Sequence, residues 1–192
     1  LRLTIFNLNK ARETDFRSPS FYYFFAVCRC FGRFSTTTMW ISMPVAFSRL
    51  TNLKKGFFDM TIRYADSSDT DKLVYLWQKC FPADSEDYIR FFYERNRDTV
   101  KTLCAICGDD LACMINLIPA DIVISEASHK AVYGYAIGAL PEYRGKGVFL
   151  SLHEYLCEYV LKNNMIYILS PENGRLADYY ESHGMRRSCY IK

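Results

Sequence analysis

The chain has 192 residues, half of them hydrophobic, which is enough for one domain of ordinary size with its own core. Residues 1–59 carry nine basic and three acidic side chains, net +6, whereas residues 60–192 carry fifteen and eighteen, net −3. A basic nucleic-acid-binding protein is not indicated, because the positive charge is confined to the first third and carries no recognition motif. The roughly 20 consecutive apolar residues of a membrane span are missing too, so we expect neither nucleic acid nor membrane as a partner.

Residues 1–59 show neither helical nor alternating periodicity, and we expect an N-terminal extension that is poorly structured or non-native. Charged residues, among them Arg12 and Asp15, precede its aromatic-rich run at 21–34, which argues against a secretory signal. Two interpretations stay open. Either Met60 is the natural start and the preceding residues lie upstream of it, or they form a genuine arm that packs apolar side chains on the domain.

The eight cysteines raise the question of a metal site, and Cys104, Cys107 and Cys113 come nearest to a ligand cluster. Their segments have strand composition, and a period of two places Cys104 and Cys107 on opposite faces. A zinc knuckle also needs a second Cys or His pair, which the sequence does not offer. We therefore expect no metal, but buried reduced thiols in a reducing cytoplasm.

From residue 60 onward the hydrophobic pattern is regular. Leu73, Leu76 and Trp77 have the spacing of one helical face, and Thr70 or Asp71 is expected to cap that helix. Pro119 is expected to interrupt a strand that resumes at 121–125, before a turn at 125–130. The expected elements are strands at 61–65, 100–107, 111–117, 131–139, 165–169 and 186–191, and helices at 70–79, 85–95, 148–163 and 174–183.

The stretch 140–149, LPEYRGKGVF, links the strand at 131–139 to the helix that begins near Val148. Glycines let backbone N–H groups turn inward, and the start of a helix favours anions through its free N–H groups and dipole. Arg144 and Lys146 add positive charge. The pattern predicts a phosphate-sized anion site, and the alternative is an ordinary basic surface turn.

Taken with its flanks, the chain from about 60 to 192 resembles the GNAT family of acetyl-CoA-dependent N-acetyltransferases. LPEYRGKGV is similar to the family's pyrophosphate loop, and LSPEN at 169–173 follows the next strand, where the family often has an Asn near the pantetheine arm. The pattern Asn173-x-x-Leu176-x-x-x-Tyr180-x-x-x-Gly184-Met185 is similar to the family's tyrosine-bearing helix.

The resemblance implies an α/β domain of the mixed α+β kind at 60–192, with a central mixed, mostly antiparallel sheet flanked by helices. Many family members continue into one more strand or a further domain. We therefore expect a domain that is incomplete at its C-terminus, with the last strand or strands missing. The final strand is then either unpaired or completed by a partner, such as a homodimer mate or a missing C-terminal domain.

The resemblance also implies a site for acetyl-CoA. Tyr180 would donate a proton to the departing thiolate, and the alternative is an aromatic on the buried face of its helix. Asn173 would contact the cofactor, and the alternative is a simple helix cap. Phe149 stands where the family keeps Gly or Ala, so its ring either crowds the phosphates or turns into the core. The remaining implied contacts are backbone groups of Gly138, Ala139 and Leu140 for pantetheine, and Arg144, Gly145, Lys146, Gly147, Val148 and Phe149 for pyrophosphate.

The implied activity is transfer of an acetyl group from acetyl-CoA to an amine of an unidentified small molecule or peptide, without a metal. The general base is not identified, and Tyr133 and Tyr135 either line the acceptor pocket or belong to the core. His129, His153 and His183 are expected to be surface or helix residues. The alternative function is a non-catalytic acyl-CoA-binding or interaction module with the same fold.

Overall fold

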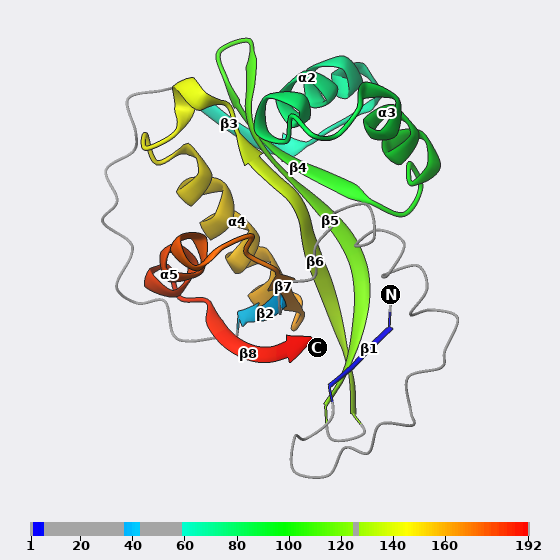
Figure 1. Ribbon diagram of the computed structural model, residues 1–192, viewed down its shortest axis with the longest axis vertical. Coiled ribbons are helices and arrows are strands. Elements are labelled where there is room, and N and C mark those ends of the chain that lie inside the picture. Colours follow the sequence, from blue (N-terminus) through cyan, green and yellow to red (C-terminus); the bar gives the residue numbers. More distant parts are fainter. Residues whose placement is uncertain (1, 6–36, 43–58, 125–126, 192) are drawn as a thin grey trace. The chain divides into compact units, whose positions relative to one another are not determined.

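The structure, a computed structural model, describes residues 2–5, 37–42, 59–124 and 127–191 (Figure 1). The chain forms two compact units. Unit 1 comprises Leu1–Met43, Pro119–Val132 and Asn164–Lys192, and unit 2 comprises Pro44–Ile118 and Tyr133–Asn163. Two long strands, β5 (Asp110–Ile124) and β6 (Ala127–Ala139), run through both units. Within the described residues, no helix is long and apolar enough to cross a membrane.

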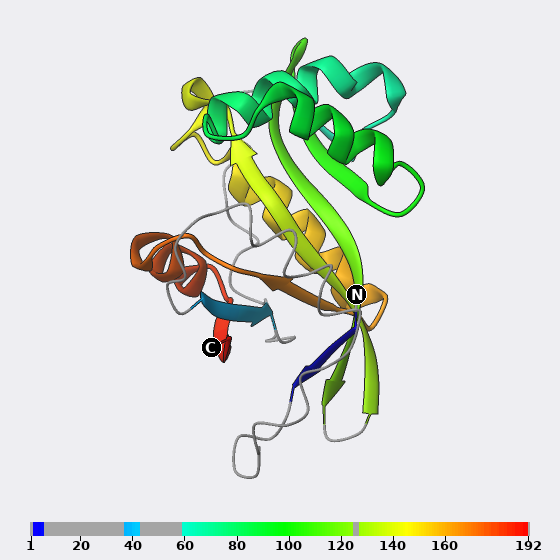
Figure 2. The same cartoon turned by 45° about the vertical axis from the view of Figure 1, so that its right-hand side comes forward.

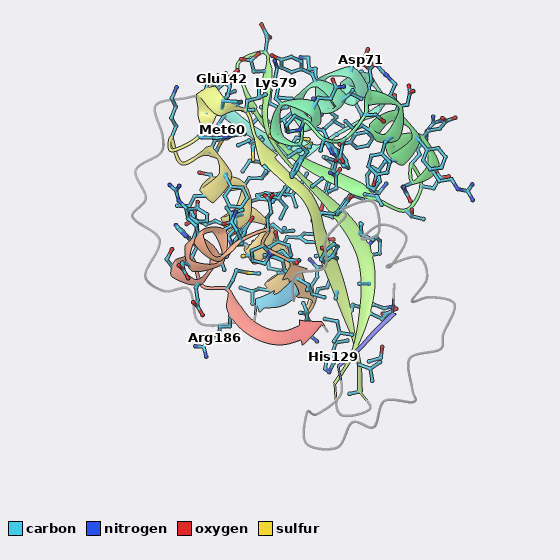
Figure 3. The ribbon with its side chains drawn as sticks, viewed as in Figure 1. Met60, Asp71, Lys79, His129, Glu142 and Arg186 are labelled. Atoms are coloured by element: carbon cyan, nitrogen blue, oxygen red, sulfur yellow. The ribbon has the colours of Figure 1, made fainter. Side chains whose placement is uncertain are left out.

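The sheet of unit 2 begins where the sequence pattern becomes regular. Strand β3 (Met60–Tyr64) pairs antiparallel with β4 (Lys101–Cys107), which pairs antiparallel with β5, and β6 lies next to β5. Figure 3 labels Met60 at the start of β3. Gly108, with φ +60°, supplies the left-handed residue of the β4–β5 turn, so the expected hairpin is confirmed.

Three helices cover the two faces of this sheet. Helices α2 (Thr70–Cys80) and α3 (Glu86–Arg95) lie side by side on one face, and α4 (Val148–Lys162) lies on the other (Figures 1 and 2). All three match the helices expected from the sequence to within one residue at each end. The cross-strand pair Cys104 and Met114 faces α2 and α3 and contributes to their apolar cluster.

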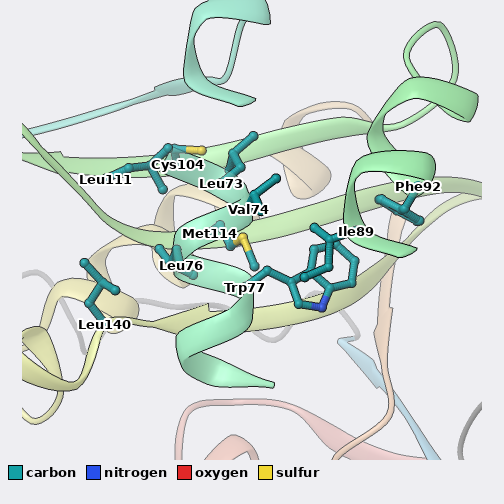
Figure 4. Packing of buried hydrophobic residues seen from close by; sticks show 10 residues of the cluster. All are labelled: Leu73, Val74, Leu76, Trp77, Ile89, Phe92, Cys104, Leu111, Met114 and Leu140. Atoms are coloured by element: carbon teal, nitrogen blue, oxygen red, sulfur yellow. The ribbon is translucent and has the colours of Figure 1, made fainter. Parts of the chain in front are cut away.

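The core on the α2–α3 side is built around Trp77, whose side chain is fully buried (Figure 4). Its ring makes edge-to-face contacts with Phe92 at 5.1 Å and with Tyr135 at 5.7 Å between centroids, and its Nε1 donates to Asp84 at 2.8 Å. Aromatic rings packed edge to face around a satisfied indole N–H make a rigid cluster. Tyr135 therefore packs against this core, although it stays half-buried itself.

The start of α2 differs from the expectation. Its N-cap is Asp69, at the end of the short 3-10 helix η1 (Ser67–Asp69), and Asp69 makes no side-chain cap bond to α2. Instead the buried Asp69 carboxylate accepts two bonds from Arg63, at 2.6 and 2.8 Å, and one from the N–H of Asp66 at 2.9 Å. The expected caps Thr70 and Asp71 are wrong because this ion pair, which joins β3 to the helix start, takes their place.

Strand β5 passes through Pro119 without a break, so the expected interruption is wrong. The last β4 partner of β5 is at Leu117, and its pairing with β1 (Arg2–Ile5) begins at Asp121. Pro119 lies between these two ladders, where the missing N–H costs little on that side. The expected turn at 125–130 is also too long, because β6 already begins at Ala127.

Ala136 in strand β6 has a positive φ of +44°, and we interpret this position as a β-bulge. Tyr133 and Tyr135 stack on one face of the strand, and Tyr135 contacts Trp77 of α2. Gly138 also faces α2. In a regular strand only residues two or four apart share a face, but Gly138 comes three residues after Tyr135. One extra residue in the strand accounts for this change of parity.

Unit 1 contains strands from both ends of the chain. Strand β2 (Thr37–Ser42) pairs antiparallel with β7 (Ile166–Leu169) and with β8 (Arg186–Ile191), and α5 (Gly174–Ser182) connects β7 to β8. Strand β1 runs parallel to the 121–124 part of β5. Residues 1–59 thus contribute two strands, and β8 has a partner in β2. The aromatic run at 21–34 lies outside the described residues.

Candidate functional site

The loop after β6 adopts a conformation that its two glycines make accessible. The 3-10 turn η2 (Pro141–Tyr143) leads into Gly145, with φ +71°, and Gly147, with φ +81°. Both angles lie in the left-handed region that residues with a Cβ avoid. Gly147 is the N-cap of α4, so the strand, glycine turn and helix predicted from the sequence are all present.

The start of α4 leaves room for an anion. Gly147 provides no side-chain cap, and the first intrahelical bond runs from Ser151 N–H to Gly147 C=O at 3.0 Å. The N–H groups of the first turn precede that bond and lie at the positive end of the helix dipole. A Cβ built at Gly145 or Gly147 would meet no heavy atom within 4 Å. Backbone donors, dipole and open space are together the features that a phosphate-binding turn needs.

A tyrosine fixes η2 to the neighbouring hairpin. The hydroxyl of Tyr143 donates to the Asp110 carboxylate at 2.7 Å, and this hydrogen bond raises the pKa of Tyr143 to about 12. The ammonium of Lys146 lies 5.9 Å from the centre of the Tyr143 ring, within cation–π range. Figure 3 labels Glu142 in the same turn. The Lys146 ammonium thus lies near the Tyr143 ring, which is itself bonded to the β4–β5 hairpin.

Arg144 turns back to the end of β6. Its Nε donates to the Ala139 C=O at 2.9 Å and its Nη2 donates to the sulfur of Cys80 at 3.7 Å. The sequence left two roles for this side chain, orienting the loop or touching phosphate. These contacts support the first.

The three residues at the end of β6 differ in what they offer a ligand. Leu140 N–H donates to the Ala112 C=O at 2.9 Å, so its amide is already committed to β5 and the expected amide contact with pantetheine conflicts with this bond. Backbone directions alternate along a strand, so Ala139 N–H points away from β5. Gly138 is buried against α2.

The ring of Phe149 lies along its own helix. It is half-buried and stacks on the fully buried His153, with 5.6 Å between centroids and 30° between planes. His153 Nε2 lies 3.7 Å from the sulfur of Cys157, one turn further on. Phe149 thus packs along α4 beside His153, and His153 is an interior residue of α4 rather than a surface one.

The other two predicted site residues belong to unit 1. The side chain of Asn173 caps α5, because its Oδ1 accepts from Leu176 N–H at 3.0 Å. Tyr180 is buried, whereas the neighbouring Tyr179 is exposed and packs on His183 at 4.3 Å between centroids. One tyrosine of the pair faces inward, as expected for residues about 100° apart on a helix.

The structure therefore brings together the predicted residues from Gly138 to Phe149 in unit 2. Asn173 and Tyr180 lie in unit 1, and their roles toward a cofactor stay predictions. Sequence reasoning missed Cys80, which carried no signal beyond its place at the end of a helical pattern. It also missed the bond between Tyr143 and Asp110, because their 33-residue separation is bridged only by the fold.

A metal site does not emerge from the described part of the chain, where no group of three or more His, Cys, Asp or Glu side chains is arranged to hold an ion.

Comparison with protein families identifies one match. The model described as "Acetyltransferase (GNAT) domain" matches residues 61–187. This range includes β3 and the loop after β6, and it also includes α5. A comparison with curated proteins finds no significant match to the sequence.

Solved structures share the fold at low sequence identity. An aminoglycoside N-acetyltransferase in complex with CoA has a TM-score of 0.57 and 17% identity, over 73% of this chain and 98% of that chain. An acetyltransferase of Trypanosoma brucei has a TM-score of 0.57 and 18% identity, over 70% and 97%. A conserved protein of unknown function from Enterococcus faecalis V583, described as a probable N-acyltransferase, has a TM-score of 0.56 and 12% identity, over 63% of this chain and only 31% of that one. The predicted fold, a mixed α/β domain with a mostly antiparallel sheet flanked by helices, is confirmed.

Proposed function

The chain belongs to the GNAT acetyltransferase family, and from this premise we propose that it transfers an acetyl group from acetyl-CoA to an amine of a small molecule or peptide. The observation that carries the proposal is the double-glycine turn at the uncapped start of α4. Gly145 and Gly147 adopt left-handed conformations there, with open space where side chains would stand.

In this proposal the pyrophosphate of acetyl-CoA occupies the space over the two glycines. Backbone N–H groups of Gly145, Lys146, Gly147, Val148 and Phe149 face it, and the dipole of α4 adds favourable charge. Ala139 N–H, which points away from β5, is the strand donor available to the pantetheine arm. Arg144 shapes the loop through Ala139 rather than binding phosphate.

The transfer forms a bond between the amine nitrogen and the acetyl carbon while the carbon–sulfur bond of the thioester breaks. The nitrogen loses a proton and the departing CoA thiolate gains one. We assign the second proton to Tyr180, which is the inward-facing tyrosine of α5. The group that accepts the first proton stays unassigned, and a water relay would serve.

Neighbouring structures support the choice of amine as acceptor class. The CoA complex named above is that of an aminoglycoside N-acetyltransferase, and another structure of that enzyme carries a bisubstrate analogue of CoA and acetylneamine. The five cysteines whose state is described are free thiols, which fits the cytoplasm as the proposed location.

A second function is a non-catalytic acyl-CoA-binding module. It is favoured by the helix-capping role of Asn173, whose Oδ1 already accepts from Leu176 N–H. Calorimetry with acetyl-CoA followed by thiol release over an amine panel separates the two functions. Binding with turnover supports the acetyltransferase, and binding without turnover supports the module. Absence of both overturns the phosphate assignment.

Gly147→Asp tests the cradle directly. The new carboxylate stands in the open space over the loop and repels phosphate, so we expect the Kd for acetyl-CoA to rise at least about tenfold. Gly108→Asp is the matched control, because Gly108 also has positive φ and open surroundings but lies in the β4–β5 turn. Equal affinity of the two variants for acetyl-CoA in calorimetry contradicts the assignment.

A further inference from the structure

The sulfur of Cys80 joins the end of α2 to the β6–α4 connection. Cys80, the last residue of α2, lies between two groups of the β6–α4 connection. Its thiol donates to the Ala139 C=O at 3.3 Å and accepts from Arg144 Nη2 at 3.7 Å. Arg144 Nε donates to the same Ala139 oxygen at 2.9 Å. Thiol, guanidinium and carbonyl thus form a closed triangle of hydrogen bonds.

The triangle depends on close approach between α2 and β6. A Cβ at Gly138 would stand 2.7 Å from the sulfur of Cys80 and 3.0 Å from its Cβ. Such distances leave no space for a side chain, so Gly138 is the residue that lets the sulfur reach the strand. Burial raises the pKa of the Cys80 thiol, which keeps the proton that it donates.

Arg144 directly precedes the left-handed Gly145. With its side chain tied to Ala139 and Cys80, Arg144 spans the whole turn from the end of β6 to the start of the glycine segment. A brace of this kind lowers the number of conformations that the loop explores before a ligand binds, and so lowers the entropy lost on binding.

We propose that Cys80 is a positioning residue for the phosphate loop, which it fixes through Arg144 without touching the ligand. The inference rests on the proposed function, because the loop is taken to hold the pyrophosphate of acetyl-CoA. It assigns a thiol of α2, which lies outside the glycine loop itself, to the binding of the phosphate part of the substrate.

The test compares two ligands, acetyl-CoA and S-acetylpantetheine, which lacks the pyrophosphate. In Cys80→Ala we expect the Kd for acetyl-CoA to rise about three- to tenfold, as for the loss of one hydrogen bond, while the Kd for S-acetylpantetheine stays within about twofold. The KM for acetyl-CoA should rise likewise with kcat nearly unchanged, because Cys80 takes no part in the chemistry.

Two further variants make the result specific. Cys80→Ser keeps a donor for Ala139 and an acceptor for Arg144, so it should restore most of the acetyl-CoA affinity. Cys104→Ala removes a buried thiol of the same apolar cluster whose sulfur lies 3.9 Å from the Thr102 C=O, and it should leave both dissociation constants unchanged. Thermal unfolding of all variants records any general loss of stability.

The outcomes are distinct. Cys80→Ala behaving like Cys104→Ala, Cys80→Ser binding as weakly as Cys80→Ala, or equal weakening for both ligands overturns the inference alone. Wild-type protein that binds no acetyl-CoA overturns the proposed function and the inference with it. If Cys80→Ala does not fold, the comparison of Cys80→Ser with wild type decides, since near-native affinity is expected there.

Discussion

Tyr179 and Tyr180 are adjacent in α5 but differ in how far their side chains are exposed to solvent. Tyr180 is 7% exposed and Tyr179 is 37% exposed, although they are neighbours in α5. The backbone C=O of Tyr180 also accepts from His183 N–H and Met185 N–H, which fixes the end of the helix. These backbone bonds hold Tyr180 at the end of α5.

Tyr180→Phe is therefore predicted to lower kcat by about a hundredfold or more, as for loss of a general acid, while the Kd for acetyl-CoA stays near the wild-type value. Thiol release under saturating amine and calorimetry measure the two quantities. Tyr179→Phe is the matched control and should retain full turnover. Unchanged kcat in Tyr180→Phe removes this residue from the mechanism.

Gly138→Ala tests the close contact between α2 and β6 as a matter of packing. Its Cβ would collide with the Cys80 sulfur at 2.7 Å, so we expect a loss of about 1–3 kcal/mol in the free energy of unfolding. Combined with Cys80→Ala the loss should shrink, because the sulfur is gone and only the 3.0 Å contact with the Cys80 Cβ is left.

Urea denaturation of the single and double variants gives the coupling between the two sites. Gly174→Ala serves as the control, because a Cβ at that position meets nothing within 4 Å and the substitution should cost little. Additive losses in the double variant contradict the predicted collision.

At the scale of elements, the ion pair at the start of α2 joins β3 to a helix. Asp69 is buried and its carboxylate accepts from Arg63 and from Asp66 N–H. These bonds, that from Arg63 foremost, hold the pKa of Asp69 below its ordinary value. A lowered pKa contributes stability above the unfolded-state pKa, and the contribution is lost as pH falls through the folded-state pKa.

Asp69→Asn is expected to lower the free energy of unfolding by about 1–3 kcal/mol at pH 7, since a charged partner is lost from a buried site. The difference from wild type should shrink below about pH 4, where the unfolded Asp begins to take up its proton. Denaturant unfolding between pH 3 and 7 measures it, with the exposed Asp71→Asn as control. A difference that is constant over this range contradicts the assignment.

Elements with strong periodicity could be predicted from the sequence, whereas features that depend on distant partners could not. The apolar spacing of Leu73, Leu76 and Trp77 defines α2, and the glycines define the loop before α4. The cap of α2 was mispredicted because Asp69 bonds Arg63 on another element. The role of Cys80 escaped notice because its partners Ala139 and Arg144 are 59 and 64 residues away.

On the scale of the whole molecule, β1 and β2 bear on the status of residues 1–59. Strand β2 is paired on both sides, with β7 and with β8. Residues 1–59 show no regular hydrophobic periodicity, so this pairing could not be predicted from the sequence. The arm and the upstream extension both stay open as interpretations, and the domain start at residue 60 stays a prediction.

A chain of residues 60–192 is accordingly expected to lose amide protection in β7 and β8, because both strands lose their partner β2. Amides of β3 and β4 in unit 2 pair with each other and should keep their protection. Hydrogen exchange of the full-length and shortened chains makes the comparison. Unchanged exchange in β7 and β8 favours a domain that begins near residue 60.

The bulge in β6 offers a way to change the curvature of the strand without changing which side chains face α2. Because Ala136 is one residue too many for regular alternation, a chain without it would still place Tyr133, Tyr135 and Gly138 on the side of α2. Most deletions inside a strand exchange its two faces, but this deletion is expected to straighten the strand and keep these three side chains on the same face. A comparison of the two chains would isolate the contribution of curvature alone to substrate binding.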